Sequence, residues 1–149
     1  MIQLFTELQE KKNVRSNLSA LRASLKEATE EQKAQAIEFV RGHEDLVFGF
    51  LQEEDAKTRK NAALLLGDLA VQNALQPLWK AYTREQTLFV KSAYLEAMKA
   101  LHAEEILSQL KDRLAELEGE PVTEENRKHW EAELRALRAI PVSYTHLRA

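Results

Sequence analysis

The stretch TRKNAALLLGDL, residues 58–69, is followed 32 positions later by a second copy of its pattern, VKSAYLEAMKAL, residues 90–101. Their apolar positions correspond without a gap: Ala62, Leu65, Leu66 and Leu69 match Tyr94, Ala97, Met98 and Leu101. Apolar residues at this spacing line one face of an α-helix. A helical unit repeated at this period is typical of helical pairs stacked in a row, which bind partners more often than they catalyse reactions.

Similar apolar stripes on both sides of this repeat predict helices in the rest of the chain. They comprise Ile2, Phe5 and Leu8; Val14, Leu18, Leu21 and Leu25; Leu46, Val47, Phe50 and Leu51; Leu75, Leu78, Trp79 and Tyr82; Leu107, Leu110, Leu114 and Leu117; and Trp130, Leu134 and Leu137. In all we expect about eight helices and no strand. The connections are short, which favours antiparallel neighbours.

Local signals predict where one further helix, after the Leu25 stripe, begins and ends. Thr29 and Gln32 have the spacing of a capping box, so a helix should start there. It should direct Ala34, Ile37 and Val40 inward and stop at Gly42 in a left-handed conformation.

Three other positions carry local signals of the same kind. Gly67 lies inside a helix, which indicates close approach by a neighbouring helix. Pro77 should occupy a first turn, where its missing N–H costs least. Thr123 should cap the final helix.

The composition is that of an ordinary soluble domain, with 44% hydrophobic and 30% charged residues in a chain of 149. The net charge of −3 argues against a module dedicated to nucleic acid. Cysteine is absent, which excludes disulfides and thiolate metal sites and fits a cytoplasmic location. No apolar run is long enough to span a bilayer, and the N-terminus does not have the pattern of a signal peptide.

The last eight residues, VSYTHLRA (142–149), break the helical pattern. They resemble the translated mosaic end of a transposase-based sequencing adaptor. We therefore expect residues 1–141 to form a single helical-repeat domain, the fragment of a longer chain, and residues 142–149 to be a non-native tail.

Residues 56–82 resemble a HEAT-type repeat, in particular the bacterial HEAT-like class first noted in phycobilisome lyases. The residues that carry the resemblance are Arg59, Ala62, Ala63, Leu66, Gly67, Leu69, Ala74, Pro77 and Leu78. The second copy, residues 88–114, departs from the pattern, because Lys91 replaces the arginine and Lys99 replaces the glycine. The resemblance implies a right-handed α-solenoid of antiparallel helix pairs. It implies no chemistry.

Catalytic and metal-binding patterns are missing from the sequence. There is no phosphate-binding glycine loop, no nucleophile elbow and no His-Glu-x-x-His motif. Glu125 and His129 would share a helix face, but two ligands do not make a metal site. We therefore expect no catalytic residue, no metal and no cofactor.

Aromatic and basic residues allow two interpretations each. Trp79 and Tyr82 could form a platform for a stacked base, but packing between helices is the favoured interpretation. Trp130 could cap the last helix interface or face a missing segment. A further set could form one basic strip for phosphate or an acidic partner: Lys57, Arg59, Lys60, Lys80, Arg84 and Lys91. Alternatively, this set covers a solvated face, with Arg59 in an internal pair with an acid between repeats.

Three functions compete. The first is a non-catalytic scaffold that binds a protein or peptide on the inner face, through Gln76, Lys80, Thr83, Arg84, Ser108, Gln109, Asp112 and Arg113. The second rests on a resemblance of residues 55–63 and 88–95 to bacterial proteins in which HEAT-type repeats precede an S-adenosylmethionine-dependent RNA methyltransferase; RNA would then be the partner. The third is a HEAT-like DNA glycosylase, which the mild negative charge disfavours. We also expect self-association through an uncapped C-terminal helix with an exposed apolar edge.

Overall fold

The computed structural model describes residues 1–141, so the adaptor-like tail expected at 142–149 lies outside the described residues. Within residues 1–141 the chain is all-helical, with nine α-helices, three short 3₁₀ helices and no strand. The elements are α1 (Ile2–Gln9), α2 (Val14–Leu25), α3 (Glu30–Gly42), α4 (Glu44–Gly49), η1 (Phe50–Gln52), α5 (Ala56–Asp68), η2 (Gln72–Ala74), α6 (Leu75–Arg84), α7 (Leu88–Lys99), η3 (Ala103–Ile106), α8 (Leu107–Gly119) and α9 (Arg127–Arg138). None of these helices is both long and apolar enough to cross a bilayer.

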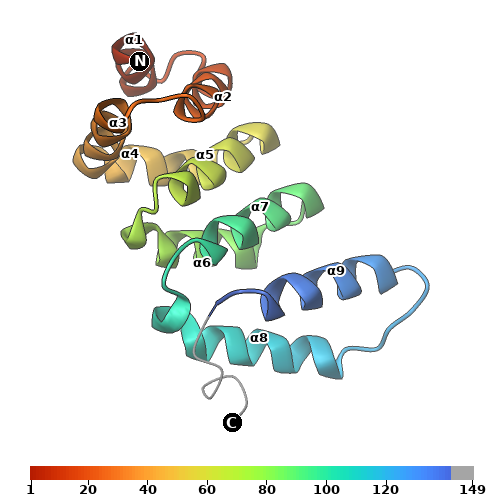
Figure 1. The fold of residues 1–149 in the computed structure, drawn as a ribbon. Coiled ribbons are helices and arrows are strands. Elements are labelled where there is room, and N and C mark those ends of the chain that lie inside the picture. The colour runs from red at the N-terminus through yellow and green to blue at the C-terminus, as the bar shows by residue number, and fades with distance from the viewer. Residues whose placement is uncertain (142–149) are drawn as a thin grey trace.

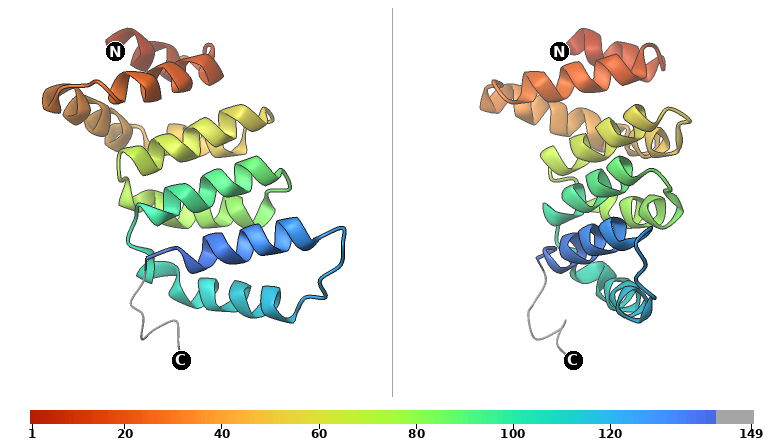
Figure 2. Two further views of the ribbon diagram at one scale, coloured as in Figure 1. Left: turned by 45° about the vertical axis from the view of Figure 1, so that its right-hand side comes forward. Right: turned by 90° about the vertical axis from the view of Figure 1, so that its right-hand side faces the viewer.

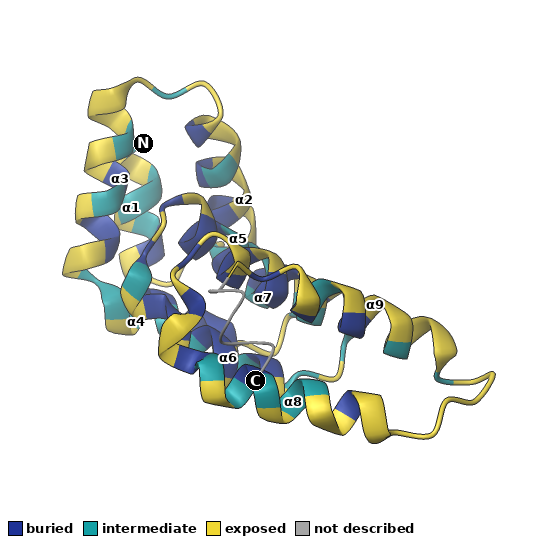
Figure 3. Cartoon of the chain, turned by 60° about the horizontal axis from the view of Figure 1, so that its bottom comes forward, coloured by how far each residue is buried: buried dark blue, intermediate teal, exposed yellow. Residues whose placement is uncertain are grey.

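Most of the helices lie in two rows, as Figures 1 and 2 show. In the first row α2 packs on α5, α5 on α7, and α7 on α9. In the second row η1 packs on α6, and α6 on η3, which leads into α8. Contacts of α5 with η1, α6 with α7 and α8 with α9 join the rows. Buried residues lie both between the rows and between neighbouring helices of the first row, and exposed residues cover the outward faces (Figure 3).

Two neighbours in the first row, α2 and α5, run in the same direction, as the ion pairs between them show. Arg15 at the start of α2 pairs with Asp55 before α5 at 3.4 Å, and Arg22 near the end of α2 pairs with Asp68 at the end of α5 at 2.8 Å. The Asp55 side chain also accepts a hydrogen bond from the Thr58 backbone N–H and so begins α5 as its N-cap.

The two copies of the repeated pattern are α5 and α7, which pack directly against each other. All eight residues of the two seams are buried, as the sequence predicts. The close approach predicted at Gly67 is confirmed, because a Cβ atom there would lie 2.8 Å from the Cα of Ala97. Pro77 is in the first turn of α6, also as predicted.

α5 ends in a Schellman turn in which the left-handed position is occupied by Ala70 and not by the usual glycine. The Val71 N–H donates to the carbonyl of Leu66, and the Ala70 N–H donates to that of Gly67, both at 3.0 Å. Ala70 has a φ of 51°, in the left-handed region where glycine is usual. The turn directs the chain into η2 and then α6.

The capping box at α3 is confirmed, but two expectations for this helix are wrong. Thr29 and Gln32 exchange both expected hydrogen bonds. Gly42, however, is the last residue of α3 and has no positive φ. Ala34 is exposed, whereas Ala36, Phe39 and Val40 face the core. The ring of Phe39 stacks on Phe5 at 4.5 Å between centroids, and this contact sets the rotation of the helix.

The start of α9 also differs from the expectation. Thr123 and Asn126 exchange hydrogen bonds between side chain and backbone, but these close a turn before the helix, which begins at Arg127. Leu134 and Leu137 are buried, so the expectation that their stripe forms an exposed apolar edge is wrong. The stripe is covered because α9 packs on both α7 and α8.

Candidate interaction groove

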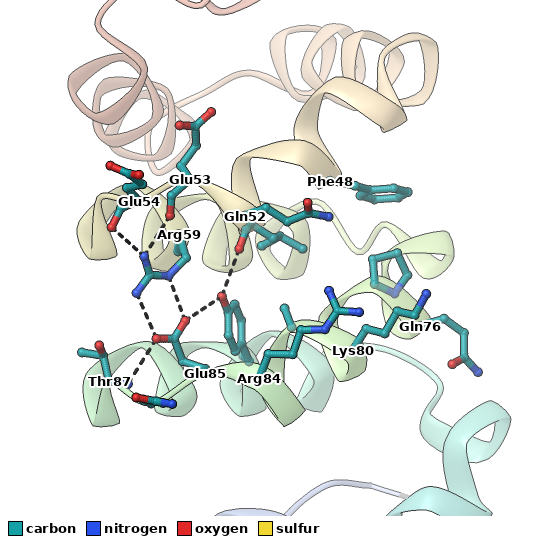
Figure 4. A pocket seen from close by; sticks show the side chains of 15 residues that line it. Phe48, Gln52, Glu53, Glu54, Arg59, Gln76, Lys80, Arg84, Glu85 and Thr87 are labelled. Atoms are coloured by element: carbon teal, nitrogen blue, oxygen red, sulfur yellow. Dashed lines mark hydrogen bonds and ion pairs between the residues drawn. The ribbon is translucent and has the colours of Figure 1, made fainter.

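A groove of about 940 Å³ lies between the α4–η1 segment and α6, as Figure 4 shows. We call it the η1–α6 groove. Its lining residues are Phe48, Leu51, Gln52, Glu53, Glu54, Arg59, Gln76, Pro77, Lys80, Ala81, Arg84, Glu85, Gln86, Thr87 and Tyr94. The groove lies between two successive elements of the second row.

One end of the groove is closed by a partly buried ion pair between Arg59 and Glu85. The guanidinium donates to both carboxylate oxygens, at 2.9 and 3.0 Å, and the hydroxyl of Tyr94 donates to the same carboxylate at 3.1 Å. Arg59 also donates to the backbone carbonyls of Glu53 and Glu54, both at 2.8 Å. This confirms the internal arginine–acid pair and fixes the distance between η1 and α6.

The surroundings of this pair shift the pKa values of its members. Burial raises the pKa of the Glu85 carboxyl, but hydrogen bonds from Arg59 and the Thr87 backbone outweigh that effect, and the pKa lies below its ordinary value. Burial, together with the neighbouring Glu85 charge, raises the pKa of Tyr94. The pair is therefore ionised and the phenol neutral near neutral pH, which is an arrangement for holding two elements together.

The other end of the groove is open and bears side chains that the fold does not use. Gln76, Lys80 and Arg84 follow one another along the exposed face of α6, opposite Phe48 and Gln52 (Figure 4). Neither Lys80 nor Arg84 forms an ion pair with any residue in the range 1–141.

The structure therefore brings together three of the eight residues proposed from the sequence, namely Gln76, Lys80 and Arg84. Their role in binding a partner stays a prediction. Thr83 is exposed on α6 and donates its hydroxyl hydrogen bond to the Lys80 carbonyl. Ser108, Gln109 and Asp112 lie on α8, outside the groove. The facing wall, with Phe48 and Gln52, was not anticipated, because no local pattern indicates that η1 packs on α6.

Arg113, the eighth proposed residue, belongs to a buried polar cluster around Glu133. Its guanidinium donates to both Glu133 oxygens, at 2.7 and 2.8 Å, and Lys91 lies 3.4 Å from the same carboxylate. The hydroxyl of Tyr82 also donates to Glu133. Sequence reasoning missed this cluster, since its members come from four helices.

The pKa values of the cluster follow from burial and hydrogen bonding. Burial raises the pKa of the Glu133 carboxyl, but the hydrogen bonds from Tyr82 and Arg113 outweigh it and the pKa is lowered. Burial raises the pKa of Tyr82, and the bond to Glu133 adds to the effect. The carboxylate therefore stays charged and connects α6, α7, α8 and α9.

The aromatic residues serve packing. Trp79 and Tyr82 are buried with ring centroids 5.2 Å apart, which confirms the core interpretation against the stacking platform. Trp130 is partly buried, and its indole N–H donates to the Leu117 carbonyl of α8. Trp130 thus contributes to the α8–α9 interface.

The single basic strip, one of the two interpretations of these six residues, does not form. Arg59 and Lys91 are held in the two ion-pair clusters. Lys80 and Arg84 line the η1–α6 groove, whereas Lys57 and Lys60 line a separate hollow between α2 and α5. The six basic residues are divided because their helices present them on different faces.

No cluster of three potential metal ligands occurs in the part of the chain that the structure describes. No protein-family model, no curated protein and no solved structure matches the chain. Function is therefore inferred from the residues of the groove itself.

Proposed function

We propose that this chain is a non-catalytic, HEAT-type helical-repeat protein, a right-handed α-solenoid of antiparallel helix pairs, that binds a segment of a partner protein in the η1–α6 groove. The observation that carries the proposal is the contrast between the two ends of this groove. One end is fixed by the Arg59–Glu85 pair, and the other presents exposed side chains with no role in the fold. A groove whose walls are already fixed favours binding, because the protein loses little conformational freedom when a partner binds to its exposed polar side chains.

The repeat itself supports this proposal. The two copies α5 and α7 share a continuous buried seam, and stacked helical units of this kind offer extended surfaces to partners. The second expectation, an accessory region of an RNA methyltransferase, would require the same surface to hold RNA. The basic residues are divided between separate hollows, which favours a protein segment over RNA as the partner.

A display library of random short peptides tests the proposal. The wild-type protein should enrich peptides that a groove variant, Gln76→Ala/Lys80→Ala/Arg84→Ala, does not retain. The control is Lys57→Ala/Glu96→Ala/Lys99→Ala, which alters three side chains outside this groove and should retain the peptides. Peptides retained equally by the groove variant and the wild type would contradict the proposal, provided that both variants keep the wild-type melting temperature.

A further inference from the structure

From the charges and apolar contacts of the η1–α6 groove, we infer that its occupant is an acidic segment of a partner protein, with carboxylates opposite Lys80 and Arg84 and an apolar side chain against Phe48 and Pro77. This inference rests on the proposed function and adds the chemistry of the partner.

The two cations point to a ligand because the fold makes little use of them. Lys80 and Arg84 are four residues apart on α6, so they repel each other on one helix face. Arg84 is in the last turn, where the helix dipole favours a cation, but Lys80 has no such support. An incoming carboxylate would relieve the repulsion and pair with both.

The acids that line the groove do not neutralise these cations. The charge of Glu85 is taken up by Arg59. Glu53 and Glu54 give their backbone carbonyls to Arg59, and Figure 4 shows their carboxylates directed away from α6. The open end of the groove therefore has a positive field although the chain as a whole has a net charge of −3.

The remaining lining favours a peptide over a phosphate polymer. Phe48, Pro77 and Ala81 are half-buried and give the groove an apolar floor. The amides of Gln52 and Gln76 provide donors and acceptors that suit a peptide backbone. Two cations over an apolar floor match a short acidic, partly apolar segment, whereas RNA binding needs many phosphate contacts.

The test uses the peptides enriched from the random library as probes. Their binding is measured by fluorescence anisotropy on the wild type and on the charge reversal Lys80→Glu/Arg84→Glu. The matched control, Lys57→Glu/Lys99→Glu, changes the net charge equally but at exposed residues outside the groove. A short fluorescent oligouridylate is titrated in parallel.

We expect the library to be enriched in acidic peptides. Their affinity should fall roughly tenfold in the groove reversal and change little in the control. Groove-dependent enrichment of neutral or basic peptides would overturn the acidic partner while the proposed function stands. If no peptide binds in a groove-dependent way, both the acidic partner and the proposed function are overturned. Oligouridylate binding that the groove reversal abolishes, without peptide binding, would show that the occupant is a nucleic acid.

Discussion

Gly67 of α5 and Ala97 of α7 meet backbone to backbone, and a Cβ atom on Gly67 would lie 2.8 Å from the Cα and 3.1 Å from the Cβ of Ala97. The missing side chain lets the two copies of the repeat pack at this distance. Because a backbone atom cannot move aside as a side-chain end can, the separation of α5 and α7 depends on this one glycine.

Gly67→Ala should therefore lower the free energy of unfolding by about 1–3 kcal/mol, since forcing the helices apart outweighs the gain in helix propensity. Gly42→Ala is the matched control, because a Cβ there meets nothing within 4 Å. It should leave stability unchanged or raise it by up to about 1 kcal/mol. Urea unfolding followed by circular dichroism measures both. If the urea midpoint of Gly67→Ala were equal to or above that of the wild type, the close packing of α5 on α7 would not depend on Gly67.

Ala70→Gly should stabilise the protein by about 0.5–1 kcal/mol. Ala70 holds a φ of 51°, a conformation that costs alanine energy and glycine almost none. Ala100 follows α7 with a φ of −84°, so Ala100→Gly relieves no strain and should be slightly destabilising. Thermal unfolding of the two variants should give shifts of opposite sign, and equal shifts would contradict the assignment of strain to Ala70.

The Arg59–Glu85 pair should make stability depend on acid pH. The folded-state pKa of Glu85 lies below its ordinary value of 4.5, so the folded protein binds fewer protons than the unfolded chain. The resulting stability is present above the unfolded pKa and is lost as pH falls below about 4.5 and through the lower folded pKa.

Glu85→Gln should lower the free energy of unfolding by about 2 kcal/mol at neutral pH, because Arg59 loses its charged partner. The difference from the wild type should shrink on acidification. Glu96→Gln, an exposed position on α7, is the control and should follow the wild-type pH profile. If Glu85→Gln lowered the free energy of unfolding equally at neutral and acid pH, the role of the ionised pair would be contradicted.

Sequence patterns predicted those parts of the fold that depend on local spacing. The seams of α5 and α7, the capping box at Thr29 and the close approach at Gly67 all follow from residues a few positions apart. Gly42 was misassigned because glycine can also be an ordinary last helical residue. The rotation of α3 depends on the contact of Phe39 with Phe5, which is distant in sequence.

The candidate groove could be predicted on one side only. The spacing of Gln76, Lys80 and Arg84 on α6 indicates a common exposed face, whereas the opposing Phe48 belongs to a segment joined to α6 only by tertiary packing. Arg113 was proposed as a binding residue because stacked helical pairs were expected to present it on their inner face. Its partner Glu133 lies 20 residues further along the chain, and no local pattern indicates that they pair.

Arg113 should therefore behave as a structural residue and its neighbour Asp112 as a surface residue. Arg113→Ala removes the main cationic partner of the buried Glu133 carboxylate and should lower the free energy of unfolding by about 2 kcal/mol, a value reduced from that of fully buried pairs because the Arg113 side chain is 27% exposed. Asp112→Ala, at an exposed position on α8, should change stability by less than about 0.5 kcal/mol.

Hydrogen exchange distinguishes a local from a global effect of Arg113→Ala. Glu133 connects α9 to three other helices, so amide protection should fall most in α9, while α2 and α5, which contribute no residue to the Glu133 cluster, keep theirs. If Arg113→Ala and Asp112→Ala had the same stability and the same α9 protection as the wild type, the Glu133 cluster would not be what holds α9 in place. Arg113 would then return to the set of candidate binding residues on α8.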